Sequence, residues 1–320
     1  MYAGSIPTPA STPPVSPRVR TSLLFGLVVL LAALVGPQAL AAPSALEAEL
    51  REIAKPFQGT VALYARNLDT GAEVAIDADR PVRTASTIKL PIACAVAQQV
   101  ATGKASWAER LTLRDASKVS GSGVLSEFGD GETVSLRDAV RLMIVVSDNT
   151  ATNLVLDRIG ADAVNDYLDT LGLVRTRSMR KIRGDGTQLK AATGWSRAGL
   201  MPENQRFGIG SSTPREMVRL LELLAAGKVV DAAASQSLLE TLERQQYKDG
   251  IGRRAGDLRV ASKSGSLDAL RSDVGIVWAP QGRIAIAITV DDMPAIDYSP
   301  DNAGNILIWR LTERILAGLR

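Results

Sequence analysis

Two side chains near residue 90 have the types and the spacing of a nucleophile and its base. Ser86 and Lys89 stand at the two ends of Ser86-Thr87-Ile88-Lys89, which opens an apolar run with a helical pattern. Side chains three residues apart on a helix lie on one face, with about 5–6 Å between their Cβ atoms. A lysine accepts a serine proton only when its own charge is lost cheaply. Burial beside Ile88 and Leu90, or a second cation nearby, favours that loss.

Two features of the composition narrow the chemistry. The 320-residue chain contains no histidine, which excludes a Ser-His-Asp or Cys-His mechanism and a histidine-ligated zinc. It contains one cysteine, Cys94, so it forms neither an intramolecular disulfide nor a cysteine cluster. Cys94 lies in an apolar run and is predicted to be core packing. The net charge is +3 without a dense basic block, so no nucleic-acid partner is predicted.

The Ser-x-x-Lys pattern is weak alone, because it also occurs at Ser178-Met179-Arg180-Lys181. That second copy opens no apolar helix, and we interpret it as chance. Two further motifs distinguish the first copy: Ser147-Asp148-Asn149 between two helical patterns, and Lys263-Ser264-Gly265 at the end of a predicted strand. Alone, each would be interpreted structurally, as a helix cap and a strand-end turn. Together, with Lys263 as the second cation, they favour one site.

The elements that must position these motifs follow a simple order. Strands are predicted near both ends of the chain and helices between them, with Asn67 to Gly71 and Ala279 to Gly282 as hairpin turns. The expected helices are 44–54, a helix from Ser86, 136–146, 150–159, 163–171, 214–226 and 303–319, and the expected strands are 59–65, 73–76, 258–262, 273–278 and 284–290.

This order predicts an α/β (α+β) fold, in which one antiparallel sheet is built from both ends of the chain and a helical region is inserted into it. The sheet part is expected at about 44–80 and 255–320, and the helical part at about 86–245, within one domain spanning 42–320. The helix at 214–226 has a recognisable start. Thr213 is its predicted N-cap, and Glu216 its capping-box partner, so Glu216 is predicted to be structural.

Residues 1–41 have the pattern of a cleaved export signal. Arg18 and Arg20 precede an apolar stretch at 22–36, and Ala39-Leu40-Ala41 supplies the small residues of a cleavage site. The stretch is shorter than the roughly 20 residues that span a bilayer, so a permanent membrane anchor is the weaker alternative. We expect a periplasmic or secreted protein that begins near residue 42.

The three motifs, in this order and on these elements, resemble those of the class A β-lactamase and penicillin-binding family of serine acyl-enzymes. The resemblance runs from about residue 45 to the C-terminus, and Gly121-Ser122-Gly123-Val124-Leu125 adds to it. It implies a β-lactamase/transpeptidase-like fold, in agreement with the fold predicted above. It also implies a β-lactam or peptidoglycan-peptide substrate, no cofactor or metal, and a monomer.

The resemblance assigns the catalytic roles residue by residue. Ser86 would be the acylated nucleophile and Lys89 its general base. Ser147 would relay the proton to the leaving nitrogen, with Lys263 as the fourth catalytic residue.

The resemblance also assigns substrate binding. Asn149 would hydrogen-bond the side-chain amide of the substrate, and Lys263 with Ser264 would bind its carboxylate along the strand edge that Gly265 leaves open. The backbone N–H groups of Ser86 and Ser266 would form the oxyanion hole. The arginine that often follows the third motif on the next strand is absent, and Arg271 is a candidate to replace it in holding a carboxylate.

The sequence departs from the family pattern at the residue that frees the acyl-enzyme. Class A relatives carry a Glu that activates the deacylating water, and Ile182 falls at that position. In the polar segment 182–213 the acids are Asp185, expected in a turn, and Glu203, a candidate base with solvated surface as its alternative. A general base contributes about 10²–10⁴-fold. Deacylation is therefore expected to be slow unless another residue, or Lys89 itself, activates water.

Three functions fit these motifs. The leading hypothesis is a β-lactam-hydrolysing enzyme of the class A type. The second is a D-Ala-D-Ala peptidase or esterase-like relative that penicillins acylate and that deacylates slowly. The third is a non-catalytic penicillin-binding sensor. The intact pair of Ser86 and Lys89 argues against it.

Overall fold

The structure is a computed structural model that describes residues 1, 4, 44–184, 192 and 194–320. The chain divides into two units, Met1–Ala42 and Pro43–Arg320, and the second is described below. The predicted export signal, apart from Met1 and Gly4, and Asp185 lie outside the described residues. Within the described part, every helix is too short or too polar to cross a lipid bilayer.

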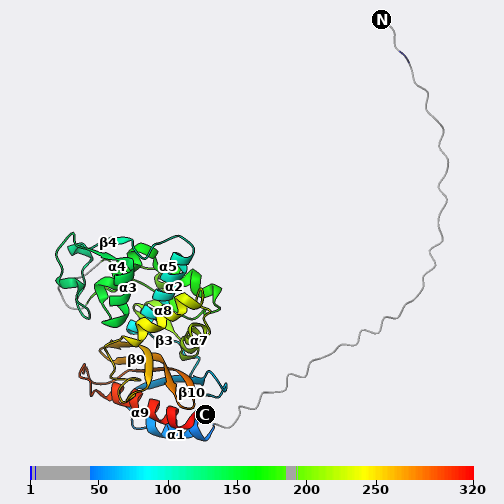
Figure 1. Ribbon diagram of the computed structural model, residues 1–320, viewed down its shortest axis with the longest axis vertical. Coiled ribbons are helices and arrows are strands. Elements are labelled where there is room, and N and C mark those ends of the chain that lie inside the picture. Colours follow the sequence, from blue (N-terminus) through cyan, green and yellow to red (C-terminus); the bar gives the residue numbers. More distant parts are fainter. Residues whose placement is uncertain (2–3, 5–43, 185–191, 193) are drawn as a thin grey trace. The chain divides into compact units, whose positions relative to one another are not determined.

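A five-stranded antiparallel sheet, in the order β2-β1-β10-β9-β8, joins the two ends of the second unit (Figure 1). Strand β1 pairs with β10 from Thr60 opposite Asp291 to Asn67 opposite Ile284, which confirms a sheet built from both ends of the chain. The strands are β1 (Thr60–Asn67), β2 (Glu73–Ile76), β8 (Arg259–Leu267), β9 (Leu270–Ala279) and β10 (Gly282–Asp291).

The two predicted hairpins are present. Asn67 is buried, and its Oδ1 accepts the N–H groups of Asp69 at 3.0 Å and Thr70 at 3.2 Å, which closes the β1–β2 turn. Gly71 completes that turn at a φ of 82°, a left-handed conformation that glycine adopts without a Cβ clash. Pro280 and Gln281 form the β9–β10 turn, because Ala279 pairs with Gly282.

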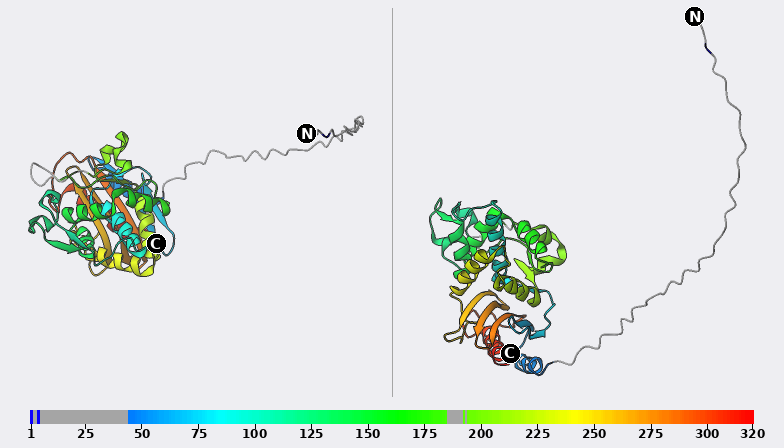
Figure 2. Two further views of the ribbon diagram at one scale, coloured as in Figure 1. Left: turned by 90° about the horizontal axis from the view of Figure 1, so that it is seen from above. Right: turned by 45° about the vertical axis from the view of Figure 1, so that its right-hand side comes forward.

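Helices cover both faces of the sheet (Figures 1 and 2). Helices α1 (Ala45–Ala54) and α9 (Ala303–Gly318) pack on one face, where Leu50 and Ile315 join a core with strand residues such as Ile286. The inserted helical part covers the other face. Its helices are α2 (Lys89–Ala101), α3 (Leu136–Val145), α4 (Asn149–Ile159), α5 (Ala161–Thr170), α6 (Arg197–Leu200), α7 (Pro214–Ala225) and α8 (Ala232–Glu243).

Helix α2 runs through the interior of the helical part. Every residue from Lys89 to Ala97 is buried, as expected for a helix that is apolar on all sides. Cys94 is buried within it, which confirms its predicted place in the core, and burial raises the pKa of its thiol.

Two elements differ from their predicted boundaries where they carry motifs. Ser86 lies in a 3₁₀ turn, η1 (Ala85–Ile88), and α2 starts only at Lys89. Strand β8 extends to Leu267, whereas the prediction ended it at 262, so the Lys-Ser-Gly motif lies inside a strand rather than at its end. The reason is that Ser264 and Gly265 continue to pair with β9.

Several short elements were not predicted, because two or three residues show too little alternation to be recognised. The pair β3 and β7 fixes the chain just before the first motif. The backbone N–H of Thr84, just after β3, donates to the carbonyl of Gly210 on β7 at 3.1 Å. These elements are the sheet of β3 (Val82–Arg83), β7 (Gly210–Ser212) and β6 (Arg177–Ser178), the pair β4 (Arg110–Thr112) and β5 (Thr133–Ser135), and the 3₁₀ turns η2 (Asp115–Ser117), η3 (Leu125–Glu127) and η4 (Pro202–Phe207).

The start of α7 confirms one half of the predicted capping box. Thr213 Oγ1 accepts the N–H of Glu216 at 3.2 Å. The carboxylate of Glu216 does not close the box. It accepts the backbone N–H of Arg175 at 2.9 Å and the hydroxyl of Thr176 at 2.7 Å, so it joins α7 to the segment before β6.

Candidate active site

Ser86 lies at a cavity of about 190 Å³ between the edge strand β8 and the helical part. It is half-buried, and the residue before it, Ala85, has a φ of 46°. A left-handed alanine is strained, and such strain persists where the surrounding structure holds it. The backbone N–H of Lys89 donates to the carbonyl of Ser86, so the 3₁₀ turn places the two side chains over each other.

Lys89 is completely buried, and its ammonium donors are all directed at the second motif. Nζ donates to the backbone carbonyl of Ser147 at 2.7 Å, to Ser147 Oγ at 3.1 Å and to Asn149 Oδ1 at 2.9 Å. Burial lowers the pKa of Lys89 far below its usual value, and the charge of Lys263 lowers it further, against a smaller opposing effect of Asp148. The shift makes the loss of a proton from Lys89 easier, as a general base requires.

Ser147 joins the two lysines. Its backbone φ is 53°, and its Oγ lies 3.1 Å from Lys89 Nζ and 3.1 Å from Lys263 Nζ. The helix-cap interpretation of Ser147 is wrong, because Asp148 is the N-cap of α4 and accepts the N–H of Ala151 at 2.7 Å. The Ser147 hydroxyl is thus left for the site.

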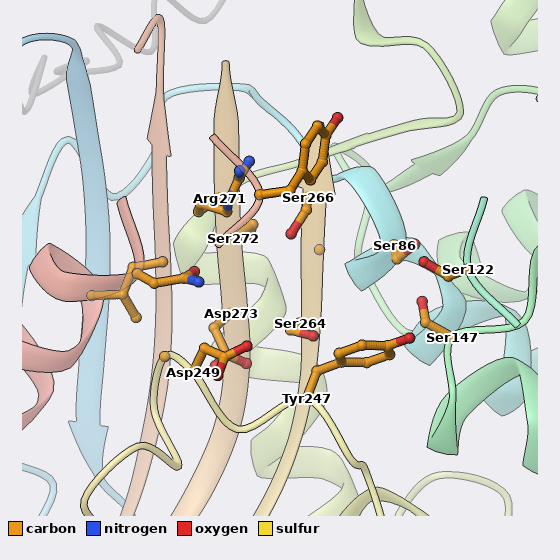
Figure 3. A pocket seen from close by; sticks show the side chains of 15 residues that line it. Ser86, Ser122, Ser147, Tyr247, Asp249, Ser264, Ser266, Arg271, Ser272 and Asp273 are labelled. Carbon is orange, nitrogen blue, oxygen red and sulfur yellow. The ribbon is translucent and has the colours of Figure 1, made fainter. Parts of the chain in front are cut away.

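The glycine-rich segment before the second motif forms the facing wall of the cavity. Ser122 lines the cavity (Figure 3), and its carbonyl accepts the N–H of Asn149 at 2.9 Å. Gly121 has a φ of 96°, and a Cβ there would lie 2.7 Å from Asn149 Nδ2. Asp148 holds the far end of the segment by accepting the N–H of Leu125 at 2.9 Å.

Lys263 and Ser264 are held by a residue that the sequence did not reveal. Gln245, which is buried after α8, accepts from Lys263 Nζ at 3.2 Å, from the N–H of Ser264 at 2.7 Å and from Ser264 Oγ at 3.1 Å. Its own Nε2 donates to Ser262 Oγ at 2.9 Å, which fixes the orientation of the amide. A lone glutamine outside any motif carries no signal in the sequence.

The third motif passes very close to the first. A Cβ at Gly265 would lie 2.9 Å from the backbone nitrogen of Ser86 and 2.8 Å from the carbonyl oxygen of Thr84. Only glycine allows this approach. Ser266 follows on β8, the edge strand of the sheet, and lines the cavity with Ser86. The structure thus brings both residues of the predicted oxyanion hole to one cavity.

Two residues on β9, Arg271 and Asp273, also carry ionisable groups at the cavity. Burial raises the pKa of Asp273 to about 7 and lowers the pKa of Lys263 to about 7, and each charge moderates the other's shift. Arg271, the candidate carboxylate ligand, lines the cavity, and its guanidinium carbon lies 4.8 Å from the centre of the Tyr298 ring. Its guanidinium donates to the backbone carbonyls of Leu267, Leu270 and Asp297.

The structure does not bring the candidate deacylation base to the site. Glu203 is an exposed residue of η4 and is not among the residues that line the cavity. Ile182 is fixed at its backbone, because Asn153 on α4 donates to its carbonyl at 2.7 Å and accepts its N–H at 2.8 Å. The second Ser-x-x-Lys copy also lies elsewhere: Ser178 is buried in β6, and Lys181 pairs with Asp157 at 2.6 Å.

An antiparallel sheet covered by helices, with a buried serine–lysine site at its edge strand, defines a class of serine acyl-enzymes. The chain belongs to the beta-lactamase enzyme family, whose sequence model matches residues 45–319.

Individual relatives agree with this membership. The chain is 27% identical to beta-lactamase L2 of Stenotrophomonas maltophilia over 300 residues, which cover 90% of this chain and 92% of that protein. It is similar to the crystal structure of a beta-lactamase from Sphaerobacter thermophilus, at 31% identity and a TM-score of 0.72 over 86% of this chain and 97% of that one. It is also similar to a PBP-A mutant in an acyl-enzyme complex with penicillin G, at 26% identity and a TM-score of 0.71 over 85% and 95%.

Proposed function

We propose that this protein is a serine hydrolase of the class A type that opens the β-lactam ring of penicillins and cephalosporins through an acyl-enzyme on Ser86. One observation carries the proposal: two fully buried lysines, Lys89 and Lys263, meet at the hydroxyl of Ser147 beside Ser86. Burying two amines together is costly. It is useful where a neutral amine must take a proton beside a cation that binds an anion.

The chemistry proceeds as an acyl transfer. Neutral Lys89 takes the proton of Ser86, whose Oγ attacks the lactam carbonyl, and the backbone N–H groups of Ser86 and Ser266 stabilise the resulting oxyanion. As the carbon–nitrogen bond breaks, the Ser147 hydroxyl gives its proton to the leaving nitrogen and recovers one from Lys89. Water then cleaves the ester and restores Ser86.

Substrate orientation follows from the same residues. Lys263 and Ser264 bind the carboxylate that lies on the leaving-nitrogen side of the lactam, and Gln245 holds both in place. Asn149, which accepts from Lys89 and donates to the carbonyl of Ser120 at 3.0 Å, presents its amide to the acyl side chain of the substrate. Arg271 supplies positive charge near the carboxylate without a direct contact, because its donors are directed at backbone carbonyls.

A chromogenic cephalosporin tests the proposal. The mature protein is expected to hydrolyse it, and intact-mass measurement on a quenched reaction should show one acyl group on Ser86. Ser86→Ala should abolish both signals. Ser178→Ala is the matched control, because Ser178 belongs to the second Ser-x-x-Lys copy and its hydroxyl is buried without a partner in the described part of the chain. Hydrolysis that survives in Ser86→Ala would overturn the assignment.

A second function, a D-Ala-D-Ala peptidase that β-lactams acylate and that deacylates slowly, is favoured by Ile182 and by the exposed position of Glu203. Under this reading the Ser86 adduct persists without turnover, and a D-Ala-D-Ala peptide releases D-alanine. A persistent adduct without peptidase activity would instead favour the sensor function.

Ile182→Glu separates slow from fast deacylation. If Ser86 is acylated and Ile182 occupies the position of the missing base, the new carboxylate should raise the deacylation rate, by about 10²-fold from the usual contribution of a general base. Ile182→Gln has the same shape without the base and should not accelerate deacylation. Equal rates in the two variants would contradict the assignment of this position.

We also propose that the protein acts outside the cytoplasm as a monomer, after cleavage of residues 1–41. N-terminal sequencing of the exported protein should start near residue 42, and light scattering should give the mass of one chain. An uncleaved N-terminus or a dimer mass would contradict the corresponding part of this proposal.

A further inference from the structure

The cavity continues past Ser264, on the side away from Ser86, and its wall there carries two carboxyl groups. Asp273 lies on β9 opposite Ser264, and Asp249 lies on the loop after α8. Figure 3 shows both side chains at this end of the cavity, with Ser264 between them and Ser86. No step of the acyl transfer proposed above uses either carboxyl group.

Asp273 is built into the wall with one oxygen unused. The residue is 1% exposed, and its Oδ2 accepts the N–H of Ile251 at 2.9 Å. Its Oδ1 is also buried and has no hydrogen-bond partner among the described residues. A buried oxygen without a partner is costly, and its presence calls for an explanation. Asp273 lines the cavity, so this free acceptor lies within the cavity wall.

Asp249 adds a second charge at the same place. It is half-buried and, within the described part of the chain, its carboxylate takes part in no ion pair or hydrogen bond. The next residue, Gly250, packs so closely on Asp273 that a Cβ there would lie 2.6 Å from Oδ2. The loop therefore holds two acids close together. Burial is the main cause of the raised pKa of Asp273, and the charge of Asp249 raises that pKa a little further.

The nearby cations do not neutralise these acids by contact. Lys263 Nζ donates to Ser147, Gln245 and Ser264, and the guanidinium of Arg271 donates to backbone carbonyls. Lys263 acts on Asp273 through its charge alone. Tyr247, on the same loop as Asp249, lines the cavity with a side chain that is 40% exposed (Figure 3). Its ring points toward Ser147 and away from the two carboxyl groups, so it borders the catalytic end of the cavity.

From this geometry we propose that Asp249 and Asp273 form a subsite for a cationic group, an ammonium or a pyridinium, on the leaving-nitrogen side of the acyl donor. The proposal rests on the function proposed above, because Lys263 and Ser264 bind the carboxylate that marks this side of the substrate. A cation in the subsite faces the carboxylate of Asp249, and the buried carboxyl group of Asp273 adds negative charge behind it. The preferred substrates are acyl donors with a positive charge beyond their carboxylate.

Two cephalosporins with the same acyl side chain test the subsite. Cephaloridine carries a pyridinium on the C3 methylene group, and cephalothin carries an uncharged acetoxy group there. The readout is the ratio of the two acylation efficiencies on Ser86, cephaloridine over cephalothin. Each efficiency is first divided by the rate of uncatalysed hydrolysis of the same compound. The wild-type protein should favour cephaloridine, and Asp249→Asn should lower the ratio by roughly 3- to 10-fold, the size of one partly screened charge contact.

Asp257→Asn is the matched control, because Asp257 is an exposed acid later on the same loop that does not line the cavity. It removes the same charge and should leave the ratio unchanged, whereas Asp249→Lys should lower the ratio further than Asp249→Asn. If both cephalosporins acylate Ser86 and the ratio is the same in wild type and Asp249→Asn, the subsite is overturned and the proposed function stands. If neither forms an adduct on Ser86, the proposed function is overturned and the subsite with it.

Discussion

Lys89 and Lys263 both contact the hydroxyl of Ser147, so the charge of Lys263 affects Lys89 at short range. Burial and the charge of Lys263 lower the pKa of Lys89, while Asp273 raises that of Lys263 against the larger effect of burial. The two amines are thereby given different tasks. Lys89 loses its proton more readily and can act as a base, and Lys263 keeps a cation for the substrate carboxylate at or below neutral pH.

This difference predicts an alkaline limit to activity. Because the pKa of Lys263 is lowered to about 7, its cation is lost as the pH rises through that value, and kcat/KM for carboxylate-bearing β-lactams should fall. This alkaline limb of the pH profile reports the coupled titration of Lys263 and Asp273. Asp273→Asn removes the negative charge that raises the pKa of Lys263, so the limb should move to lower pH. A pH profile of kcat/KM for both proteins checks this, and an unmoved limb would contradict the coupling.

Gln245 permits a second prediction at the residue scale. Gln245→Leu removes the acceptor that Lys263 Nζ and both donors of Ser264 share. Each buried donor left without a partner costs about 1–3 kcal/mol. KM for carboxylate-bearing β-lactams should therefore rise by roughly tenfold or more.

Gln245→Glu distinguishes positioning from packing. It keeps the acceptor and adds a negative charge beside Lys263, which should raise the lysine pKa and move the alkaline limb to higher pH. Steady-state kinetics with pH profiles of both variants provide the measurement. A limb that stays in place in Gln245→Glu would argue that Gln245 only fills space.

At the scale of elements, each motif depends on how one segment ends and the next begins. The strained backbone at Ala85 and Ser147 turns η1 and the start of α4 toward one cavity, and β8 brings Gly265 against the first of these turns. Helix α7 supports the arrangement from outside, because Glu216 ties its first turn to the segment before β6. That segment pairs through β6 and β7 with β3, directly before Ser86.

The N-cap of α7 provides a stability prediction. Thr213→Ala removes the hydroxyl that accepts the N–H of Glu216, and loss of such a cap costs about 1 kcal/mol. For a protein of this size the melting temperature should fall by about 2–4 °C. Thr213→Ser keeps the acceptor and should lose much less. Calorimetry of the three proteins decides, and equal losses in both variants would assign the effect to the methyl group of Thr213.

At the scale of the whole molecule, the sequence predicted the architecture well because long amphipathic helices and two clear hairpin turns fix the order of the elements. The three motifs and their meeting point were predicted from their residue types, their order along the chain and the family resemblance. The sequence did not reveal Gln245, Asp249 or Asp273 as site residues, because their roles depend on a loop and a neighbouring strand that come together only in three dimensions. It also placed the Lys-Ser-Gly motif beyond its strand, since serine and glycine are weak strand formers that β9 pairing overrides.

The pairing of β1 with β10 has a further consequence. Thr60 meets Asp291, which lies 231 positions later in the chain, so the sheet cannot close until almost the whole polypeptide is available. Contacts so distant in sequence make folding slow. During synthesis, the chain should therefore emerge from the ribosome without its central sheet. A polypeptide that stays unfolded until its last strand arrives is the form that a translocation channel accepts, which is compatible with the export proposed above.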